Sequence, residues 1–329
     1  MKSNLAKKEV RCPSCAESRA RLVATGFDRE YDDTTDDRFT MVKCEACRLL
    51  YLSPRPDESE LPTIYPDNYH AYDMVRGKKK GIATVTRQWV YGLRLRKALR
   101  SLAADRPLSL LDIGCGDAWM LDCYRALRPD ARTFGVDINA RACAIARHKG
   151  HEVFEGRFED IDFVNRRFDF INASHVIEHV ADPKTFLRKA ASLLAPGGAL
   201  CIETPNTQSL DARLFGESWG AFHFPRHWTL YDAHTLSEMA RSCGLRPDKI
   251  YFHACPVHWH WSLHNLFTGK AWLKPLAKIF RPDIIFRKGL LTICYLAFFT
   301  VIDQAIKLSG LPTSNMMAIL RPGRECDAV

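Results

Sequence analysis

A chain of 329 residues is long enough for about two domains and a sizeable buried core. Hydrophobic residues make up 47% and charged residues 26%, which matches a globular protein and excludes a disordered tail protein, a collagen-like repeat and a heptad rod. The 47 Lys and Arg against 38 Asp and Glu give a net charge of +9, which favours anionic surfaces or substrates without requiring nucleic acid.

The N-terminus gives no sign of secretion. Residues 1–15 are polar and contain two cysteines, so they lack the apolar core and the small-residue cleavage site of a secretory signal. We therefore expect a cytoplasmic protein, in which the 12 cysteines are thiols or metal ligands rather than disulfides. No apolar run reaches the ~18 residues of a spanning helix, and the run that comes closest is the uncharged one over 289–302.

Two cysteine pairs mark an N-terminal segment, predicted over 1–53. Cys12 and Cys15 form the first pair and Cys44 and Cys47 the second, with 28 residues between the pairs, enough for a short hairpin. Each pair presents two thiolates to one tetrahedral ion, so we predict a closed, structural zinc site; the alternative is four unrelated buried or redox-active thiols. A proline-rich connector follows over 54–81.

The middle of the chain alternates between helical and strand-like patterns. An amphipathic helix is predicted over 82–104, where the domain core begins. Predicted strands then alternate with helices: strands over 108–113, 132–137, 167–173, 199–203, 249–255 and 316–320, and helices over 119–127, 140–149 and 183–194. This alternation is typical of an α/β, doubly wound, Rossmann-like sheet, with the core ending at 255.

A glycine-rich turn follows the first of these strands. Gly114 and Gly116 let the backbone approach a ligand closely, and Asp137 at the end of the next strand can accept hydrogen bonds from ribose hydroxyls. A dinucleotide fingerprint would place a third glycine where Trp119 stands, and the nearby Asp112 opposes a pyrophosphate but suits a cationic cofactor. The alternative is a turn with only a packing role.

These motifs resemble the class I S-adenosylmethionine-dependent methyltransferases between about 108 and 245. The resemblance rests on five motifs: Leu-Asp-Ile-Gly-Cys-Gly at 111–116, Val-Asp-Ile at 136–138, Phe-Asp-Phe at 168–170, His-Val-Ile-Glu-His-Val at 175–180 and Leu-Ala-Pro-Gly-Gly at 194–198. The resemblance implies a seven-stranded sheet and S-adenosylmethionine bound by Asp112, Gly114, Gly116, Asp137, Ile138, Phe158, Glu159 and Ala173. Two positions depart from the pattern: Ala118 replaces a usual glycine, and Arg157 a usual aspartate.

The acceptor is less narrowly defined. The cysteine pairs, the Ser-Pro-Arg-Pro connector and Pro-Arg-His at 225–227 resemble a subgroup associated with bacterial cell-surface glycan pathways, which favours a sugar or lipid-linked glycan. The alternatives are a quinone-like or other small aromatic acceptor, and a zinc-ribbon RNA methyltransferase or nucleic-acid-binding protein. Aspartates between the cysteine pairs would repel phosphate and make nucleic acid unlikely. A scaffold that has lost its donor is disfavoured because Asp137 and the glycine turn remain.

Four histidines are candidates for removing a proton from an acceptor hydroxyl, because imidazole titrates near neutrality. His175 and His179 follow the strand predicted over 167–173, and His223 and His227 lie in a loop expected at the same edge. In that loop and just after it, the predicted acceptor contacts are Trp219, Arg226 and Tyr231, with a structural ion pair as the alternative for Arg226.

A helical insertion is predicted over 256–315, before a last strand and tail at 316–329. It holds tryptophans, lysines and the uncharged run, an order that suits an anionic membrane interface. Peripheral contact with the inner face of the membrane is therefore one prediction, and a lid over the core or a dimer surface is the alternative. His258 and His260 have no cysteine or carboxylate at ligand spacing, so no metal is predicted there. The sequence does not predict an oligomeric state.

Overall fold

The computed structural model describes residues 4–31, 33–66, 92, 96, 99, 102, 106–282, 284 and 289–323. The connector beyond 66 and most of the amphipathic helix predicted over 82–104 lie outside the described residues.

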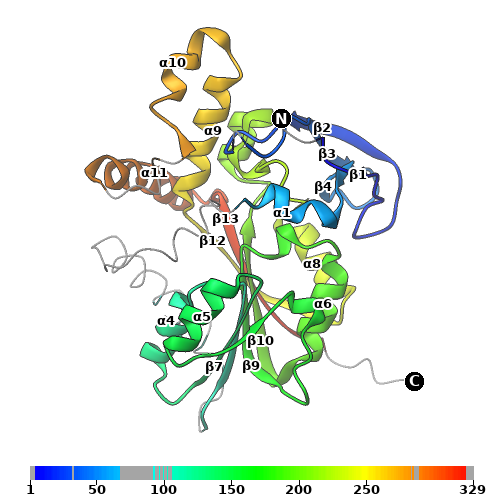
Figure 1. Ribbon diagram of the computed structural model, residues 1–329, viewed down its shortest axis with the longest axis vertical. Coiled ribbons are helices and arrows are strands. Elements are labelled where there is room, and N and C mark those ends of the chain that lie inside the picture. The colour runs from blue at the N-terminus through cyan, green and yellow to red at the C-terminus, as the bar shows by residue number, and fades with distance from the viewer. Residues whose placement is uncertain are drawn as a thin grey trace.

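A seven-stranded sheet forms the centre of the molecule (Figure 1), in the order β12-β13-β10-β9-β6-β7-β8. Strands β8, β7, β6, β9 and β10 are parallel, while β13 runs antiparallel to both β10 and β12. The strands are β6 (Ser109–Ile113), β7 (Arg132–Asp137), β8 (Glu152–Glu155), β9 (Phe168–Ser174), β10 (Leu194–Pro205), β12 (Leu245–His253) and β13 (Asn315–Pro322). The Rossmann-like fold class predicted from the sequence is confirmed.

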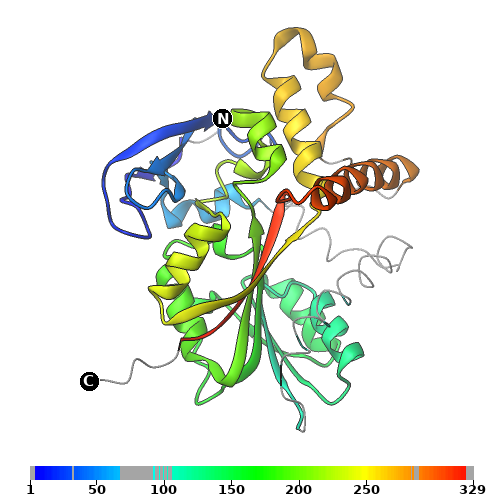
Figure 2. The same ribbon diagram turned by 180° about the vertical axis from the view of Figure 1, so that it is seen from behind.

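Helices cover both faces of this sheet. Figure 1 and Figure 2 show α4 (Trp119–Leu127) and α5 (Ala140–His148) on one face, and α6 (Pro183–Ser192) and α8 (Ala233–Arg241) on the other. Two apolar clusters of buried side chains include residues of these helices and of the strands. Caps fix the helix starts: for α5, the side chain of Asn139 accepts a hydrogen bond from the backbone N–H of Ala142 at 2.9 Å.

A four-stranded sheet, in the order β11-β4-β3-β2, forms the N-terminal part. Its strands are β2 (Ala20–Gly26), β3 (Phe39–Cys44) and β4 (Leu50–Leu52), and β2 and β3 form an antiparallel hairpin in the segment between the cysteine pairs, which is long enough for one. The fourth strand, β11 (Thr229–Leu230), comes from the loop after β10, so this sheet includes a strand from the core segment predicted over 82–255. Nearby are β1 (Lys7–Lys8), which pairs with β5 (Arg55–Pro56), the 3-10 helix η1 (Glu58–Glu60) and α1 (Leu61–Ile64).

Short helices and loops gather at the carboxyl ends of the parallel strands. They are η3 (Phe158–Asp160), η4 (Ile177–His179), α7 (Leu210–Phe215), η5 (Gly216–Ser218) and η6 (Gly220–Phe222). A third apolar cluster joins the loop after β10 to the N-terminal sheet. It includes Trp219, Phe222 and Trp228 of the loop together with Phe39 and Leu50 of the sheet. The loop therefore packs as part of the N-terminal unit.

The insertion between β12 and β13 is helical, with α9 (Pro256–Thr268), η7 (Ala271–Leu273), α10 (Lys274–Ala277) and α11 (Leu290–Leu308). Figure 2 shows α9 and α10 at the same end of the central sheet as the N-terminal strands. A close backbone approach holds α9 there: Gly220 donates its N–H to the hydroxyl of Ser262 at 2.8 Å, and a Cβ on Gly220 would lie 2.8 Å from the carbonyl oxygen of His258. Among the described helices, none is both long and apolar enough to cross a bilayer.

Candidate functional site

The glycine turn after β6 lies beside β7. The backbone N–H groups of Gly114 and Cys115 both donate to the carbonyl oxygen of Val136, at 2.8 and 3.0 Å. Gly114 has φ +72°, and a Cβ there would lie 2.8 Å from a methyl group of Val176. Gly116 has φ +52°, and a Cβ there would meet no atom within 4 Å. The turn thus needs glycine for its conformation and leaves open space beside Gly116, where a ligand can approach the backbone.

Ala118 occupies the position where the methyltransferase pattern usually has glycine. Its backbone is left-handed, with φ 64° and ψ 25°, and its side chain is fully buried at the start of α4. An L-residue in this region costs roughly 1–2 kcal/mol, which explains why glycine is usual there. The turn keeps the left-handed conformation despite the substitution.

Asp137 connects the turn to the end of β7. Its Oδ2 accepts a hydrogen bond from the N–H of Gly116 and its Oδ1 from the N–H of Asn139, both at 2.8 Å. Burial raises the pKa of this carboxyl, although the two backbone donors act against that shift. The next side chain, Ile138, is 58% exposed and offers an apolar surface beside the carboxylate. A ligand with hydroxyls next to a planar group fits this pair.

Asp112 lies beneath the turn, at 4% exposure, and accepts a hydrogen bond from the side-chain amide of Asn172 at 2.7 Å. Burial raises the pKa of Asp112 to about 7, and the negative charge of Asp137 adds to the shift. Ala173 is fully buried between β6 and β10.

The residues after β8 pack against the protein's own side chains. Phe158 is 4% exposed and its ring packs edge-on against Phe186 at 5.1 Å between centroids. The carbonyl oxygen of Glu159 accepts from the ammonium of Lys189 at 2.7 Å. A contact between a ligand and Phe158, Glu159 or Ala173 stays a prediction. Arg157, the second departure from the family pattern, forms an ion pair with Glu58 at 2.6 Å and so ties η3 to the N-terminal segment.

His175 directly follows β9 and has a left-handed backbone, with φ 55°. Its Nδ1 lies 3.1 Å from Oε1 of Glu178 and its Nε2 lies 3.3 Å from the amide nitrogen of Asn315, while 35% of the side chain is exposed. Glu178 is fully buried, and its other oxygen accepts from the hydroxyl of Thr204 at 3.0 Å. Burial acts to raise the pKa of Glu178, but the hydrogen bond and charge of His175 outweigh it, so the pKa is lowered. Glu178 is therefore a carboxylate that orients His175.

The other three predicted histidines lie together. The ring centroids of His179 and His227 are 4.7 Å apart, and those of His223 and His227 4.8 Å apart. Burial lowers the pKa of His179 to about 4 and that of His227 well below its usual range, with neighbouring histidines adding to both shifts. Both rings are therefore neutral at pH 7. The sequence prediction that the two pairs of histidines share one edge is consistent with this arrangement, whereas their catalytic role stays a prediction.

The three residues predicted to contact the acceptor are all buried. The guanidinium of Arg226 forms a bidentate pair with Asp28, at 2.7 and 3.2 Å, and donates through Nε to the carbonyl oxygen of Ile64 at 2.8 Å. Trp219, 1% exposed, donates its indole N–H to Asp211 at 2.7 Å, and Tyr231 is fully buried. The structural ion pair considered for Arg226 is present; acceptor contacts by the three stay predictions.

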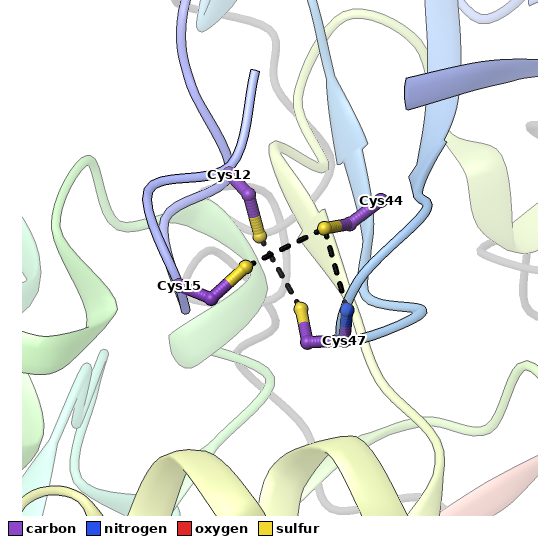
Figure 3. A group of neighbouring side chains, drawn as sticks. All are labelled: Cys12, Cys15, Cys44 and Cys47. Atoms are coloured by element: carbon purple, nitrogen blue, oxygen red, sulfur yellow. Dashed lines mark hydrogen bonds between the residues drawn. The ribbon is translucent and has the colours of Figure 1, made fainter. Parts of the chain in front are cut away.

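The four cysteines of the N-terminal segment converge (Figure 3). The Sγ atoms of Cys12 and Cys47 are 3.4 Å apart, those of Cys15 and Cys44 3.5 Å apart, and all four lie within 4.8 Å of one another. Zn–S bonds of about 2.3 Å in a tetrahedron place sulfurs about 3.8 Å apart, so the four thiols match the size of a zinc site. Burial raises the pKa of the Cys12 thiol because it disfavours the charged thiolate. A bound cation would stabilise that thiolate.

Sequence reasoning missed several polar partners at the sheet edge. Glu178, Asn172 and Asn315 each bond a predicted site residue, yet none was predicted as one. For Glu178 the signal was present: a carboxylate three residues after His175 and directly before His179. For Asn315 no local signal exists, because 140 residues separate it from His175.

Comparison with known proteins identifies a matching family model, curated relatives and similar solved structures. A family model described as a methyltransferase domain matches residues 87–250. A ubiquinone biosynthesis O-methyltransferase of Cereibacter sphaeroides (strain ATCC 17025 / ATH 2.4.3) is 32% identical over 182 residues, which cover 50% of this chain and 73% of that protein. The same enzyme of Nitrobacter winogradskyi is 42% identical over 113 residues, 32% of this chain and 42% of that protein. The solved cyclopropane synthase MmaA2 from Mycobacterium tuberculosis has 16% identity and a TM-score of 0.46, covering 78% of this chain and 94% of that one.

Asp112 makes folding stability depend on pH. Its pKa rises from 3.8 to about 7 on folding, so the folded chain holds this proton more tightly than the unfolded chain. Stability is therefore lost as pH rises from about 4 to about 7. In Asp112→Asn this loss is absent, so the stability of the variant relative to the wild type should be about 1–3 kcal/mol greater at pH 8 than at pH 5. Thermal unfolding at both pH values measures it, with the exposed Asp130→Asn as control. An equal difference at the two pH values would contradict the prediction.

Proposed function

Because this chain belongs to the S-adenosylmethionine-dependent methyltransferase family, we propose that it methylates a hydroxyl oxygen of a small, quinone-like aromatic acceptor. The observation that carries this proposal is a relative named as a ubiquinone biosynthesis O-methyltransferase. It is 32% identical to this chain in an alignment that covers 73% of the relative's length. That alignment covers half of this chain, and the family model covers residues 87–250.

The donor site proposed here is the glycine turn and the end of β7. The open backbone beside Gly116 would approach the ligand, the carboxylate of Asp137 would accept from ribose hydroxyls, and Ile138 would pack against the adenine ring. The carboxylate of Asp137, which accepts two backbone hydrogen bonds, suits the cationic groups of the donor. S-adenosylmethionine supplies the methyl group on a sulfonium that is its own leaving group, so this chain has mainly to align the acceptor and exclude water.

His175 is the proposed general base. The carboxylate of Glu178 accepts from Nδ1–H, which leaves Nε2 as the nitrogen that takes a proton. Nε2 has the long, 3.3 Å contact with Asn315, and an acceptor hydroxyl would replace that contact. Nε2 of His175 would take the proton of the acceptor hydroxyl as its oxygen is methylated, and the carboxylate of Glu178 would stabilise the resulting imidazolium.

A sugar or lipid-linked glycan is the second acceptor candidate. The sequence motifs at 53–56 and 225–227 favour it, but the two curated relatives described above are named as ubiquinone biosynthesis O-methyltransferases and give it no support. Both acceptor classes can be lipid-attached, and a feature of the insertion suits that. Exposed large apolar side chains gather on its helices: Trp272, Leu276, Ile279, Ile293, Phe298, Val301 and Leu308. The exposed Lys270, Lys274 and Lys278 lie among them. We infer that this surface contacts an anionic membrane peripherally.

For the four cysteines we propose one structural zinc ion. Four protein ligands would leave no position for water, so the ion would stabilise the N-terminal sheet rather than take part in the reaction. This sheet includes β11 and contacts the loop that carries His223 and His227, so the zinc would act on the site through that loop.

A methyl-transfer assay with labelled donor tests the proposed function. Purified full-length protein is given hydroxylated quinols, nucleotide sugars and lipid-linked sugars, and we expect transfer to the quinols. His175→Asn should lower kcat by about 10²–10⁴ while the affinity for S-adenosylmethionine stays unchanged, because the base acts on the acceptor. The exposed His148→Asn is the control. Transfer to the sugars alone would contradict the acceptor class, and full activity of His175→Asn would contradict the base.

Flotation with liposomes tests the membrane contact. We expect binding that increases with anionic lipid and decreases with salt, because lysines near the apolar surface attract acidic headgroups. Replacing Phe298 and Val301 together by serine should abolish binding, whereas replacing Leu22 and Val164, exposed apolar residues outside the insertion, should not. Wild-type protein that ignores anionic liposomes would contradict the proposal.

A further inference from the structure

Three donor side chains meet between the central sheet and the loop after β10, well away in sequence from the cysteine pairs. They are Glu178 and His179 of η4 and His227 of the loop, and one ligand atom of each lies within 4.8 Å of the other two. Three atoms that lie within 4.8 Å of one another all lie within about 2.8 Å of a common point. Metal–nitrogen bonds are about 2.0–2.1 Å long, so the three ligand atoms need to move inward only slightly to bind an ion.

Hydrogen bonds fix which nitrogen of each ring is free to bind a cation. His179 directs Nδ1 at the carbonyl oxygen of Arg226, 3.0 Å away, and at the hydroxyl of Tyr65, 2.9 Å away, whose oxygen can also accept. His227 directs Nδ1 at the carbonyl oxygen of Ala221, 2.7 Å away. A carbonyl oxygen only accepts, so both Nδ1 atoms carry the proton and both Nε2 atoms carry a lone pair. A backbone carbonyl behind the second ring nitrogen is the usual support of a metal-binding histidine.

A third histidine lies beside this group. Nε2 of His223 lies 2.6 Å from the carboxylate of Glu30 and carries a proton, and Nδ1 of His223 lies 3.4 Å from Nε2 of His227. The fully buried carboxylate of Glu178 adds negative charge at the same place. Either a metal ion or the second proton of an imidazolium at His223 supplies the positive charge that balances this arrangement.

We propose that Glu178, His179 and His227 bind a divalent first-row metal ion of the zinc or iron(II) type, at a site separate from the four cysteines. Two imidazoles and one carboxylate form a donor set that such ions accept, and three protein ligands leave a coordination position for an oxygen ligand. An ion there would join η4 to the loop of His223 and His227, next to the hydrogen bond between Glu178 and His175.

Cobalt(II) distinguishes the two sites, because a four-thiolate site gives an intense charge-transfer band and a nitrogen–oxygen site does not. We expect full-length wild-type protein, stripped of metal and titrated with Co²⁺, to bind about two equivalents per chain, only one of them with the thiolate band. His227→Gln and Glu178→Gln should each lose one equivalent and keep the band. Cys44→Ser should lose the band and keep the other equivalent.

The matched control is His151→Gln, which changes an equally buried histidine that bonds Thr133. It should keep both equivalents. A wild type that binds one equivalent, all of it lost in Cys44→Ser, would overturn the proposal even if the histidine variants fail to fold. In that case a protonated His223 donating to His227 accounts for the cluster. Because metal content is measured without turnover, this result is independent of the acceptor and of methyl transfer.

Discussion

The buried ion pair between Arg226 and Asp28 holds the two parts of this molecule together. Both side chains are completely inaccessible, and each of the three guanidinium nitrogens donates a hydrogen bond, two to the carboxylate oxygens and one to the carbonyl oxygen of Ile64. Removing one partner of such a pair leaves a buried charge without compensation, typically at a cost of about 3–5 kcal/mol. The pair therefore specifies how the N-terminal sheet sits on the loop after β10.

That loop positions the polar side chains at the carboxyl edge of the central sheet. The carbonyl oxygen of Arg226 itself orients His179, and the backbone N–H of Trp228 donates to the carbonyl oxygen of Glu178 at 2.7 Å. Glu178 in turn orients His175. The N-terminal unit would thus act on the proposed reaction through the backbone of one loop.

Local patterns predicted the central sheet well. The helix over 119–127 and the strand over 132–137 have the expected bounds, because buried apolar runs and helical spacing are readable within a few residues. Strand β8 was missed because its four residues, Glu-Val-Phe-Glu, contain only two apolar residues between charged ones and form no longer apolar run. Strand β11 was missed because two residues carry no pattern, and its partner β4 is remote in sequence.

The site was predictable only where the chemistry is local. The glycine turn and Asp137 are recognisable from spacing, since the strands fix their positions. The surroundings of Arg226 were not, because the carboxylate that neutralises it is 198 residues away and the sequence shows only a charged residue near two histidines. Burial decides whether such a residue meets a substrate or a structural partner, and burial is a property of the whole fold.

Calorimetric titration with S-adenosylhomocysteine, the demethylated donor, tests the central claim most directly. The account predicts one binding site per chain, weakened about 5- to 150-fold in Asp137→Asn through the loss of about 1–3 kcal/mol of charge-assisted hydrogen bonding. Glu155→Gln, which changes an exposed carboxylate on the neighbouring strand β8, should bind as the wild type does. Unchanged affinity in a folded Asp137→Asn variant would contradict the placement of the donor at this edge.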